Sequence, residues 1–240
     1  MKRELSVVIP TYNERENVRI LVPRVLDVFA ANDIDGEIVI AEDHSTDGSR
    51  EVLEALSARV PQLRVLFRDL PNSIARAWFD GFSAATKNNI VCIDADLCHD
   101  PKYFPMMLDA LDEYDMVIGS RYLRNRAESM AGKSPAAIYV SVLGQFLTRI
   151  ATGFSESDTS HSFRMFKRSV FTGIKDKLHQ EGNVFLIDFL FQAKRNGARV
   201  TEIPIEYGKR IHGETKLSIS KEGFRYLIFI SKLMISRVFS

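Results

Sequence analysis

The sequence predicts an α/β fold: a mostly parallel sheet with helices covering both faces. Two observations predict it. Along the first half, short apolar runs alternate with segments of helical apolar spacing, which is the pattern of repeated strand–helix units. The apolar run at 90–93 then ends abruptly at Asp94 and Asp96, as a buried strand does when it delivers polar groups to the ligand-binding edge of such a sheet. With 240 residues, 45% of them hydrophobic, one domain with a sizeable core is expected.

Each element of the first half follows from its local pattern. The apolar runs predict strands at 5–10, 37–41, 63–67, 90–93 and 115–119. The segments between them predict helices at 14–31, 47–59, 73–87 and 101–111. Val18, Leu21 and Val25 give the first helix an apolar face, residues 47–49 suit an N-terminal cap for the second, and Pro101 begins the fourth.

After residue 119 the alternation of strands and helices changes. Residues 121–134 are polar and predict a loop. Beyond it the pattern predicts a helix at 136–152, strands at 163–166 and 200–205, and a helix at 185–195 between those strands. Since no repeat or linker interrupts the chain, we expect one domain over 1–217, followed by a C-terminal segment over 218–240.

That C-terminal segment has a broad apolar face and a narrow polar stripe with Lys221, Arg225 and Lys232 at helical spacing. The pattern predicts an amphipathic helix lying in a membrane interface. A helix packed on the domain, or a dimer contact, would have the same pattern. No stretch reaches the ~20 apolar residues of a membrane span, so a peripheral protein is expected.

Overall charge gives no reason to expect a nucleic acid polymer as partner, because 32 basic and 31 acidic residues nearly cancel. The two cysteines indicate neither a disulfide framework nor a zinc site. Cys92 lies in a predicted strand and is expected to be buried, while Cys98 falls in the acidic loop after it.

Three predicted loops follow strands and carry polar groups: 10–14, 42–48 and 94–96. Taken alone, each loop has a simpler interpretation, because its polar residues are also typical of a helix start or a turn. Because the carboxyl ends of parallel strands share one edge, the three loops should meet there. Asp94 and Asp96 point to opposite faces of an extended strand, so they share a ligand only if the strand has already turned. Two carboxylates on a turning loop suit Mg²⁺ or Mn²⁺.

Four motifs together resemble the family 2 glycosyltransferases of the GT-A fold. They are VVIPTYNERENV, IVIAEDHSTDGS, CIDADLCHDP and VIGSRY. Within that family they are similar to the polyprenyl- and dolichyl-phosphate mannose synthases. The resemblance covers roughly residues 5–125 and resumes at SFRMFKRSVF and at ARVTEIPIEYGKRIHGETKL.

The resemblance implies a role for each matching position. The donor nucleotide would be bound by Pro10, Tyr12, Glu14, Glu42, Asp43 and Asp94, and the metal by Asp94 and Asp96. The catalytic set would be Asp96, Arg121, Arg210 and Lys216, the last two from a segment read here as RIHGETKL. A solvated basic loop is the other interpretation of Arg210 and Lys216.

The implied reaction moves a hexose, mannose or glucose, from GDP-mannose or UDP-glucose to a polyprenyl or dolichyl phosphate, with inversion. Metal and basic side chains stabilise the negative charge that develops on the leaving diphosphate. The acceptor phosphate is already ionised and needs no general base. We expect the enzyme on the cytoplasmic side of a membrane. Two alternatives stay open: a family 2 transferase with a soluble glycan or protein-linked acceptor, and a catalytically silent subunit that binds sugar nucleotides.

The sequence departs from the family pattern at several places. Cys98 replaces a glutamine that can complete the metal shell, and water or His99 are candidate replacements. The family's glycine-rich R-x-x-G-L-G-x-A reads RDLPNSIAR here, and its S-G-F-R reads His161-Ser162-Phe163-Arg164.

The acceptor-phosphate arginine of the family has no clear match in this sequence. The candidate acceptor residues are Lys133, Ser134, Ser141 and Asp158. Asp188, a lone acid in an apolar predicted helix, has both a structural and a catalytic interpretation.

Overall fold

The computed structural model describes residues 2–69, 73–123, 135–179, 182, 184–208, 226 and 228–231, and for 135–142 and 145 it describes the backbone alone. Its centre is a seven-stranded sheet in the order β3-β2-β1-β4-β6-β5-β7. The strands are β1 (Arg3–Thr11), β2 (Ile34–Glu42), β3 (Leu63–Phe67), β4 (Asn89–Cys92), β5 (Met116–Ser120), β6 (Arg164–Lys167) and β7 (Val200–Pro204).

Neighbouring strands are parallel except at β6, which runs antiparallel to both β4 and β5. Arg164, the first residue of β6, pairs with Cys92, the last residue of β4. The chain therefore enters β6 from the edge at which the parallel strands end.

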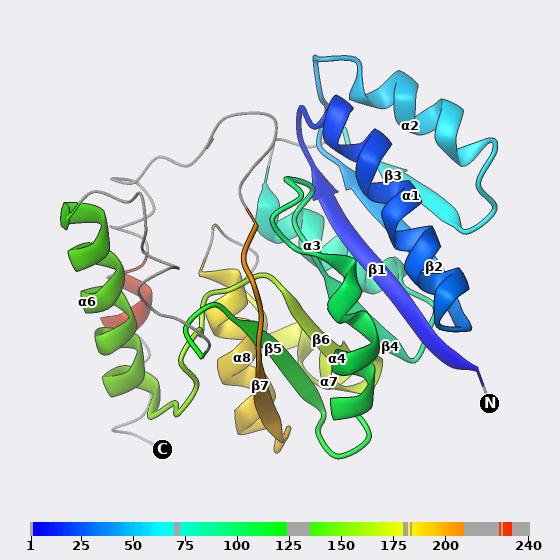
Figure 1. The fold of residues 1–240 in the computed structure, drawn as a ribbon. Helices are drawn as coiled ribbons and strands as arrows, with labels where there is room; N and C mark the ends of the chain where they lie inside the picture. The colour runs from blue at the N-terminus through cyan, green and yellow to red at the C-terminus, as the bar shows by residue number, and fades with distance from the viewer. Residues whose placement is uncertain are drawn as a thin grey trace.

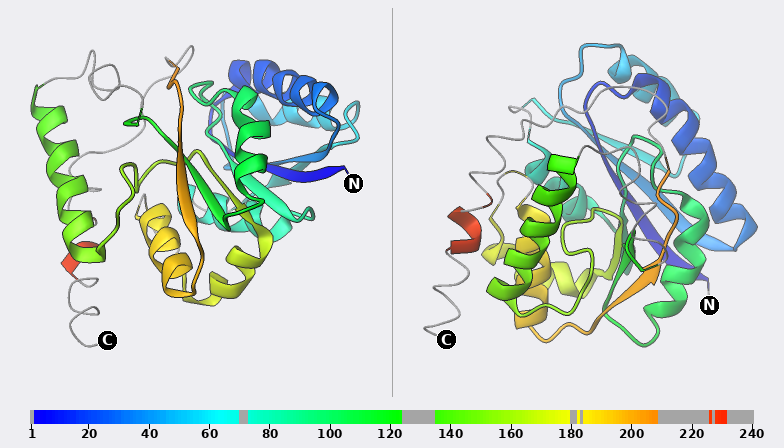
Figure 2. Two further views of the ribbon diagram at one scale, coloured as in Figure 1. Left: turned by 60° about the horizontal axis from the view of Figure 1, so that its bottom comes forward. Right: turned by 60° about the vertical axis from the view of Figure 1, so that its left-hand side comes forward.

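Helices cover both faces of the sheet (Figures 1 and 2). One layer holds α1 (Arg15–Ala31), α2 (Ser49–Ser57), η1 (Pro101–Tyr103) and α4 (Phe104–Ala110). The other holds α3 (Ile74–Ala84), α7 (Arg168–Ile174), η2 (Lys175–Lys177) and α8 (Phe185–Arg195). The long helix α6 (Pro135–Thr152) lies outside the sheet, at the end of the molecule that carries β7 and α8.

Strand residues alternate between two hydrophobic cores, one on each face. In β1, Val7 packs with the α1 side and Val8 with the α3 side, and both are fully buried. This is the period-two pattern of a sheet covered on both faces. Gly81 lets α3 approach β1 closely, because a Cβ there would lie 2.3 Å from a methyl carbon of Val8.

The predicted fold class is confirmed, and most elements lie where the sequence put them. The bounds of β3 and α8 match the expected 63–67 and 185–195. The predicted helix at 101–111 is divided into η1 and α4. Helix α7 and the antiparallel direction of β6 were not expected from the sequence.

Most of the C-terminal segment 218–240 lies outside the described residues. The part that is described, Tyr226 and 228–231, is helical, and Phe229 and Ile230 are buried in the core on the α8 side. The interfacial helix and the division at residue 217 stay predictions. No helix in the described part of the chain has the length and hydropathy needed to cross a membrane.

Candidate active site

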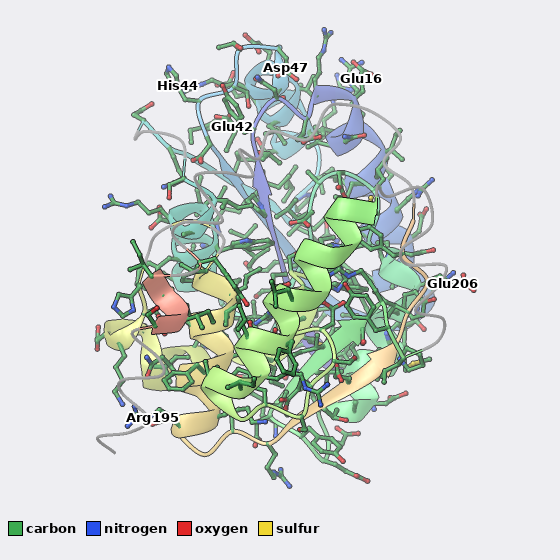
Figure 3. The ribbon with its side chains drawn as sticks, turned by 90° about the vertical axis from the view of Figure 1, so that its left-hand side faces the viewer. Glu16, Glu42, His44, Asp47, Arg195 and Glu206 are labelled. Atoms are coloured by element: carbon green, nitrogen blue, oxygen red, sulfur yellow. The ribbon has the colours of Figure 1, made fainter. Side chains whose placement is uncertain are left out.

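The polar loops predicted from the sequence meet at one edge of the sheet. Figure 3 places Glu42, His44 and Asp47 at one end of the molecule, with Arg195, near the carboxyl end of α8, at the opposite end. The parallel strands β1, β2, β4 and β5 end at this edge, and the antiparallel β6 begins there. It is the edge at which open α/β sheets bind their ligands.

The loops after β1 and β2 are joined by hydrogen bonds. The backbone N–H of Asn13 donates to Ser45 Oγ at 2.8 Å, and the side-chain oxygen of Asn13 accepts from the Thr46 N–H at 2.8 Å. Asn13 has φ of 54°, a left-handed conformation that asparagine tolerates better than most residues. These two loops therefore form one rigid unit that carries the expected nucleotide-binding residues Tyr12 and Glu14.

Glu42, the last residue of β2, and Asp43, which follows it, have different surroundings. Glu42 is fully buried, and its carboxylate accepts from the N–H groups of His44 and Ser45 in its own loop. Asp43 forms an ion pair with the buried Arg68 and accepts from the Ser73 N–H at 2.9 Å. Burial raises the pKa of Asp43, although these two partners act in the opposite direction.

Arg68 is a functional candidate that the sequence argument did not name. It joins Asp43 to Asp80 of α3, where its Nε donates at 2.8 Å. Its second terminal nitrogen, Nη2, is buried with no hydrogen-bond partner in the described chain. The sequence feature that could have indicated Arg68 is its position at the start of the stretch RDLPNSIAR, which replaces the family's glycine-rich segment.

Asp94 and Asp96 lie in a loop, because β4 ends at Cys92. The positive φ of Leu97, 65°, turns the chain directly after Asp96. Asp94 Oδ2 accepts from Ser162 Oγ at 2.7 Å, and Asp96 Oδ1 accepts from the Cys98 N–H at 3.1 Å. The strand has thus ended and the chain has turned at these two residues, which is the condition, expected from the sequence, for both carboxylates to share one ligand.

Behind this loop lies a pair of buried histidines whose tautomers follow from their partners. The Asp94 N–H donates to His99 Nδ1 at 3.0 Å, and His161 Nδ1 lies 2.6 Å from the Gly119 carbonyl, which only accepts. The Nε2 atoms are 3.1 Å apart, so His99 donates and His161 accepts there. Both rings are neutral in this arrangement. Burial, first of all, lowers the pKa of both histidines.

The donor set fits a hard divalent cation that takes most of its ligands from outside the protein. Asp94 and Asp96 supply carboxylate oxygens, and Mg²⁺ or Mn²⁺ commonly completes such a shell with water and substrate phosphate. Within the described ranges no three His, Cys, Asp or Glu residues gather as a ligand cluster. Both ring nitrogens of His99 are engaged in hydrogen bonds, so the replacement of the missing glutamine by water or His99 stays a prediction, and this arrangement favours water.

Arg121 and Asp158 are paired with each other. The Nε and Nη2 of Arg121 donate to the two Asp158 oxygens at 2.7 and 2.8 Å, and Asp158 is fully buried. Burial lowers the pKa of Arg121, but the hydrogen bond and charge of Asp158 more than offset this and raise it. Asp158 is therefore placed to hold Arg121, and its direct contact with the acceptor stays a prediction.

The segment before β6 is fixed by two further residues. Glu202 of β7 accepts from the N–H groups of Ser157 and Asp158 at 2.7 and 3.0 Å. Arg164 is fully buried and donates to the carbonyls of Thr159, His161 and Leu186. Burial lowers the pKa of Arg164 to about 10. Glu202 had no signal in the sequence, since only pairing in the sheet brings it to this segment.

Tyr207, shortly after β7, covers this part of the site. Its ring lies 5.6 Å from His99, 5.5 Å from His161 and 5.5 Å from the guanidinium of Arg121. Gly208 then passes the acidic loop, and its N–H donates to the Cys98 carbonyl at 2.9 Å. Burial, with the charges of Asp96 and Asp94 adding to it, raises the pKa of Tyr207.

Several predicted site residues cannot be placed. Arg210, Lys216, Lys133 and Ser134 lie outside the described residues, and of Ser141 only the backbone, in α6, is described. For Asp188 the structure favours the structural interpretation. Its buried carboxylate accepts from the His179 N–H at 2.9 Å and from Gln192 Nε2 at 3.1 Å.

Comparisons with known proteins identify the family of this chain. Residues 6–174 match the model of glycosyl transferase family 2. An undecaprenyl-phosphate mannosyltransferase of Micrococcus luteus is 29% identical over 215 residues, which cover 88% of this chain and 86% of that protein. A dolichol-phosphate mannosyltransferase of Pyrococcus furiosus is 32% identical over 237 residues, which cover 96% of this chain and 64% of that protein.

Solved structures show the same fold at lower sequence identity. A mannosyltransferase from Pyrobaculum calidifontis, solved with GDP-Man and Mn²⁺, superposes with a TM-score of 0.68 at 17% identity, covering 98% of this chain and 65% of that one. Glucosyl-3-phosphoglycerate synthase from Mycobacterium tuberculosis gives 0.67 at 17% identity, covering 95% and 78%. With the family model matching well over half of its length, this chain belongs to glycosyl transferase family 2.

Proposed function

We propose that this glycosyltransferase moves mannose from GDP-mannose to a polyprenyl phosphate, with a divalent cation and inversion at the sugar. One observation carries the proposal: the loops at 10–14, 42–48 and 94–99 lie at one sheet edge in a chain whose curated relatives include polyprenyl- and dolichol-phosphate mannosyltransferases. The solved mannosyltransferase with GDP-Man and Mn²⁺ has the same fold and supports the choice of donor class.

In this proposal the side chains bind and orient the reactants. Tyr12, Glu14, Glu42 and Asp43 surround the nucleotide, while Asp94 and Asp96 hold the cation. The cation supplies positive charge to the donor diphosphate. An oxygen of the acceptor phosphate attacks the anomeric carbon as its bond to the diphosphate breaks. The acceptor is already an anion, so no side chain has to remove a proton from it.

Arg121 is the described cation best placed to act on phosphate charge. Its pairing with Asp158 fixes the guanidinium plane, and Tyr207 packs on it. A fixed guanidinium stabilises developing negative charge without reorganising during the reaction. Arg210 and Lys216 are proposed to assist from the segment beyond residue 208.

The assay that tests this function is transfer of radiolabelled sugar to a short polyprenyl phosphate. GDP-mannose and UDP-glucose are compared, each with Mn²⁺, Mg²⁺ or a chelator. Lipid-linked mannose that disappears with chelator is the expected result. Lipid-linked glucose instead would reassign the donor. Donor binding without any product would favour the silent subunit, and product only on a soluble glycan would favour the other acceptor class.

We propose further that the enzyme works at the cytoplasmic surface of a membrane, where such an acceptor is dissolved. The support is a stripe on α6 formed by Leu143, Phe146 and Ile150, which are 40%, 58% and 51% exposed. Their spacing puts them on one helical face. Large apolar side chains exposed together suit contact with a lipid interface.

A further inference from the structure

Two of the departures from the family pattern, His161 and Ser162, contact the acidic loop directly or through one other residue. The Ser162 hydroxyl donates to Asp94 Oδ2, and His161 reaches the Asp94 backbone through His99. Both residues lie in the segment that leads into β6, far from Asp94 in sequence. The glycine found in the family at position 162 has no hydroxyl group with which to make the first contact.

The hydroxyl of Ser162 fixes the orientation of one carboxylate. A carboxylate has two oxygens and about four sites at which it accepts hydrogen bonds or binds cations. Ser162 occupies one site on Oδ2 of Asp94 at 2.7 Å, which restricts rotation of the group and leaves Oδ1 for an ion. Ser162 is only 8% exposed, so water competes poorly for this hydrogen bond.

The histidine pair fixes the backbone of the same residue. It links the Asp94 N–H to the Gly119 carbonyl at the end of β5 through hydrogen bonds of 3.0, 3.1 and 2.6 Å. The family has serine at position 161. A serine side chain is too short to reach both His99 and the Gly119 carbonyl, which the two ring nitrogens of His161 contact from opposite sides of the ring. His99 and His161 are 1% and 4% exposed, and Arg164 holds the carbonyl of His161 from behind.

We propose that Ser162 and His161 are positioning residues for the cation-binding carboxylate of Asp94. They stabilise this loop from behind, where Cys98 replaces a side chain that could have served as a ligand. The inference rests on the proposed function, since it assumes that Asp94 binds a divalent cation. Residues that orient ligands commonly contribute 10–100-fold to metal affinity, about the effect expected here.

The test measures Mn²⁺ binding to the full chain, with and without GDP. The electron paramagnetic resonance signal of free Mn²⁺ reports how much of the ion is bound. Ser162→Ala is expected to weaken Mn²⁺ binding about tenfold with little change in melting temperature. Ser162→Thr, which keeps the hydroxyl, is expected to bind like the wild type. Ser160→Ala, an exposed serine two residues away, is the matched control.

His161→Phe tests the second residue. It keeps an aromatic ring beside Tyr207 but removes both ring nitrogens, and about tenfold weaker Mn²⁺ binding is expected. In transfer assays both variants should need more Mn²⁺ for half-maximal rate yet reach the wild-type rate at saturating Mn²⁺, a split that a loss of packing alone would not produce.

The outcomes separate this inference from the proposed function. A variant that binds Mn²⁺ as tightly as the wild type overturns the role of that residue, and the proposed function stands. A wild-type chain that binds no Mn²⁺, even with GDP, overturns both the cation site and its positioning residues.

Discussion

At the residue scale, hydrogen bonds within the protein orient the carboxylates of both Asp94 and Asp96. Asp94 accepts from Ser162, and Asp96, only 4% exposed, accepts from the Cys98 N–H. Such hydrogen bonds orient a carboxylate before an ion arrives. The two acids are thus oriented for the cation that we propose they bind, and the described residues contain no group of three His, Cys, Asp or Glu side chains that would form a complete protein site.

Replacing Asp96 by alanine should abolish metal-dependent donor binding. Because even an orienting residue contributes 10–100-fold to metal affinity, loss of a ligand should weaken Mn²⁺ binding about 100-fold or more. Calorimetric titration of Mn²⁺ and GDP-mannose measures both effects. Asp100→Asn, an exposed acid in the same loop, is the control and should bind normally. Normal Mn²⁺-dependent binding by Asp96→Ala would remove Asp96 from the cation site.

At the scale of elements, Asp115 joins three strands at the edge opposite the site. Its carboxylate accepts from the Arg199 N–H before β7 at 3.0 Å and from Lys167 Nζ at the end of β6 at 2.9 Å. The backbone hydrogen bond from Arg199 is the main cause that lowers the pKa of Asp115 to about 2. Both ends of the antiparallel β6 are held by side-chain contacts: Lys167 by Asp115, and Arg164 by the carbonyls of Thr159, His161 and Leu186.

This lowered pKa predicts a stability change in acid. Between pH 4 and pH 2, Asp115 is protonated in the unfolded chain but stays ionised in the folded protein. Its contribution to the free energy of unfolding is therefore full above about pH 4 and is lost as pH falls through 2. In urea unfolding, the difference in free energy of unfolding between wild type and Asp115→Asn should shrink from pH 5 to pH 2.5. The exposed Asp176→Asn is the control. A difference that is constant with pH would contradict the assignment.

The direction of β6 explains why part of the site was missed. From the sequence, we expected site residues after strands, and the loops following β1, β2 and β4 match that expectation. The chain enters β6 at the same edge, however, so the residues before this strand also reach the site. Asp158 was expected there from the family motif, but the contacts of His161 and Ser162 were not.

At the scale of the whole molecule, α6 presents a stripe of three exposed apolar side chains. Leu143, Phe146 and Ile150 are exposed, while the other face of α6 packs on Tyr226, whose ring lies against Gly144. The helix therefore has one face that packs on Tyr226 and one exposed face, which we propose contacts a lipid surface.

Replacing Phe146 and Ile150 by serine should weaken binding to vesicles of anionic and neutral lipid. Burying an apolar side chain of this size contributes about 1.5–3 kcal/mol, so about tenfold or more is expected. Stability should change little, because both side chains are about half exposed. Met106→Ser is the control, because Met106 is 48% exposed on α4, in the helix layer that also holds α1. Vesicle sedimentation gives the affinities, and equal binding by all three proteins would argue against α6 as the contact.

The sequence by itself determined the fold class, the family, most of the strands and helices, and the loops that carry Asp43, Asp94 and Asp96. These follow from local periodicity and from motifs only a few residues long, so short windows contain the information. Which side chains meet was decided by the tertiary structure alone. Arg121 and Asp158 are 37 residues apart, His99 and His161 are 62 apart, and Asp94 and Ser162 are 68 apart. Contacts at such separations depend on strand order and direction, and here the reversal of β6 brings a distant segment under the acidic loop.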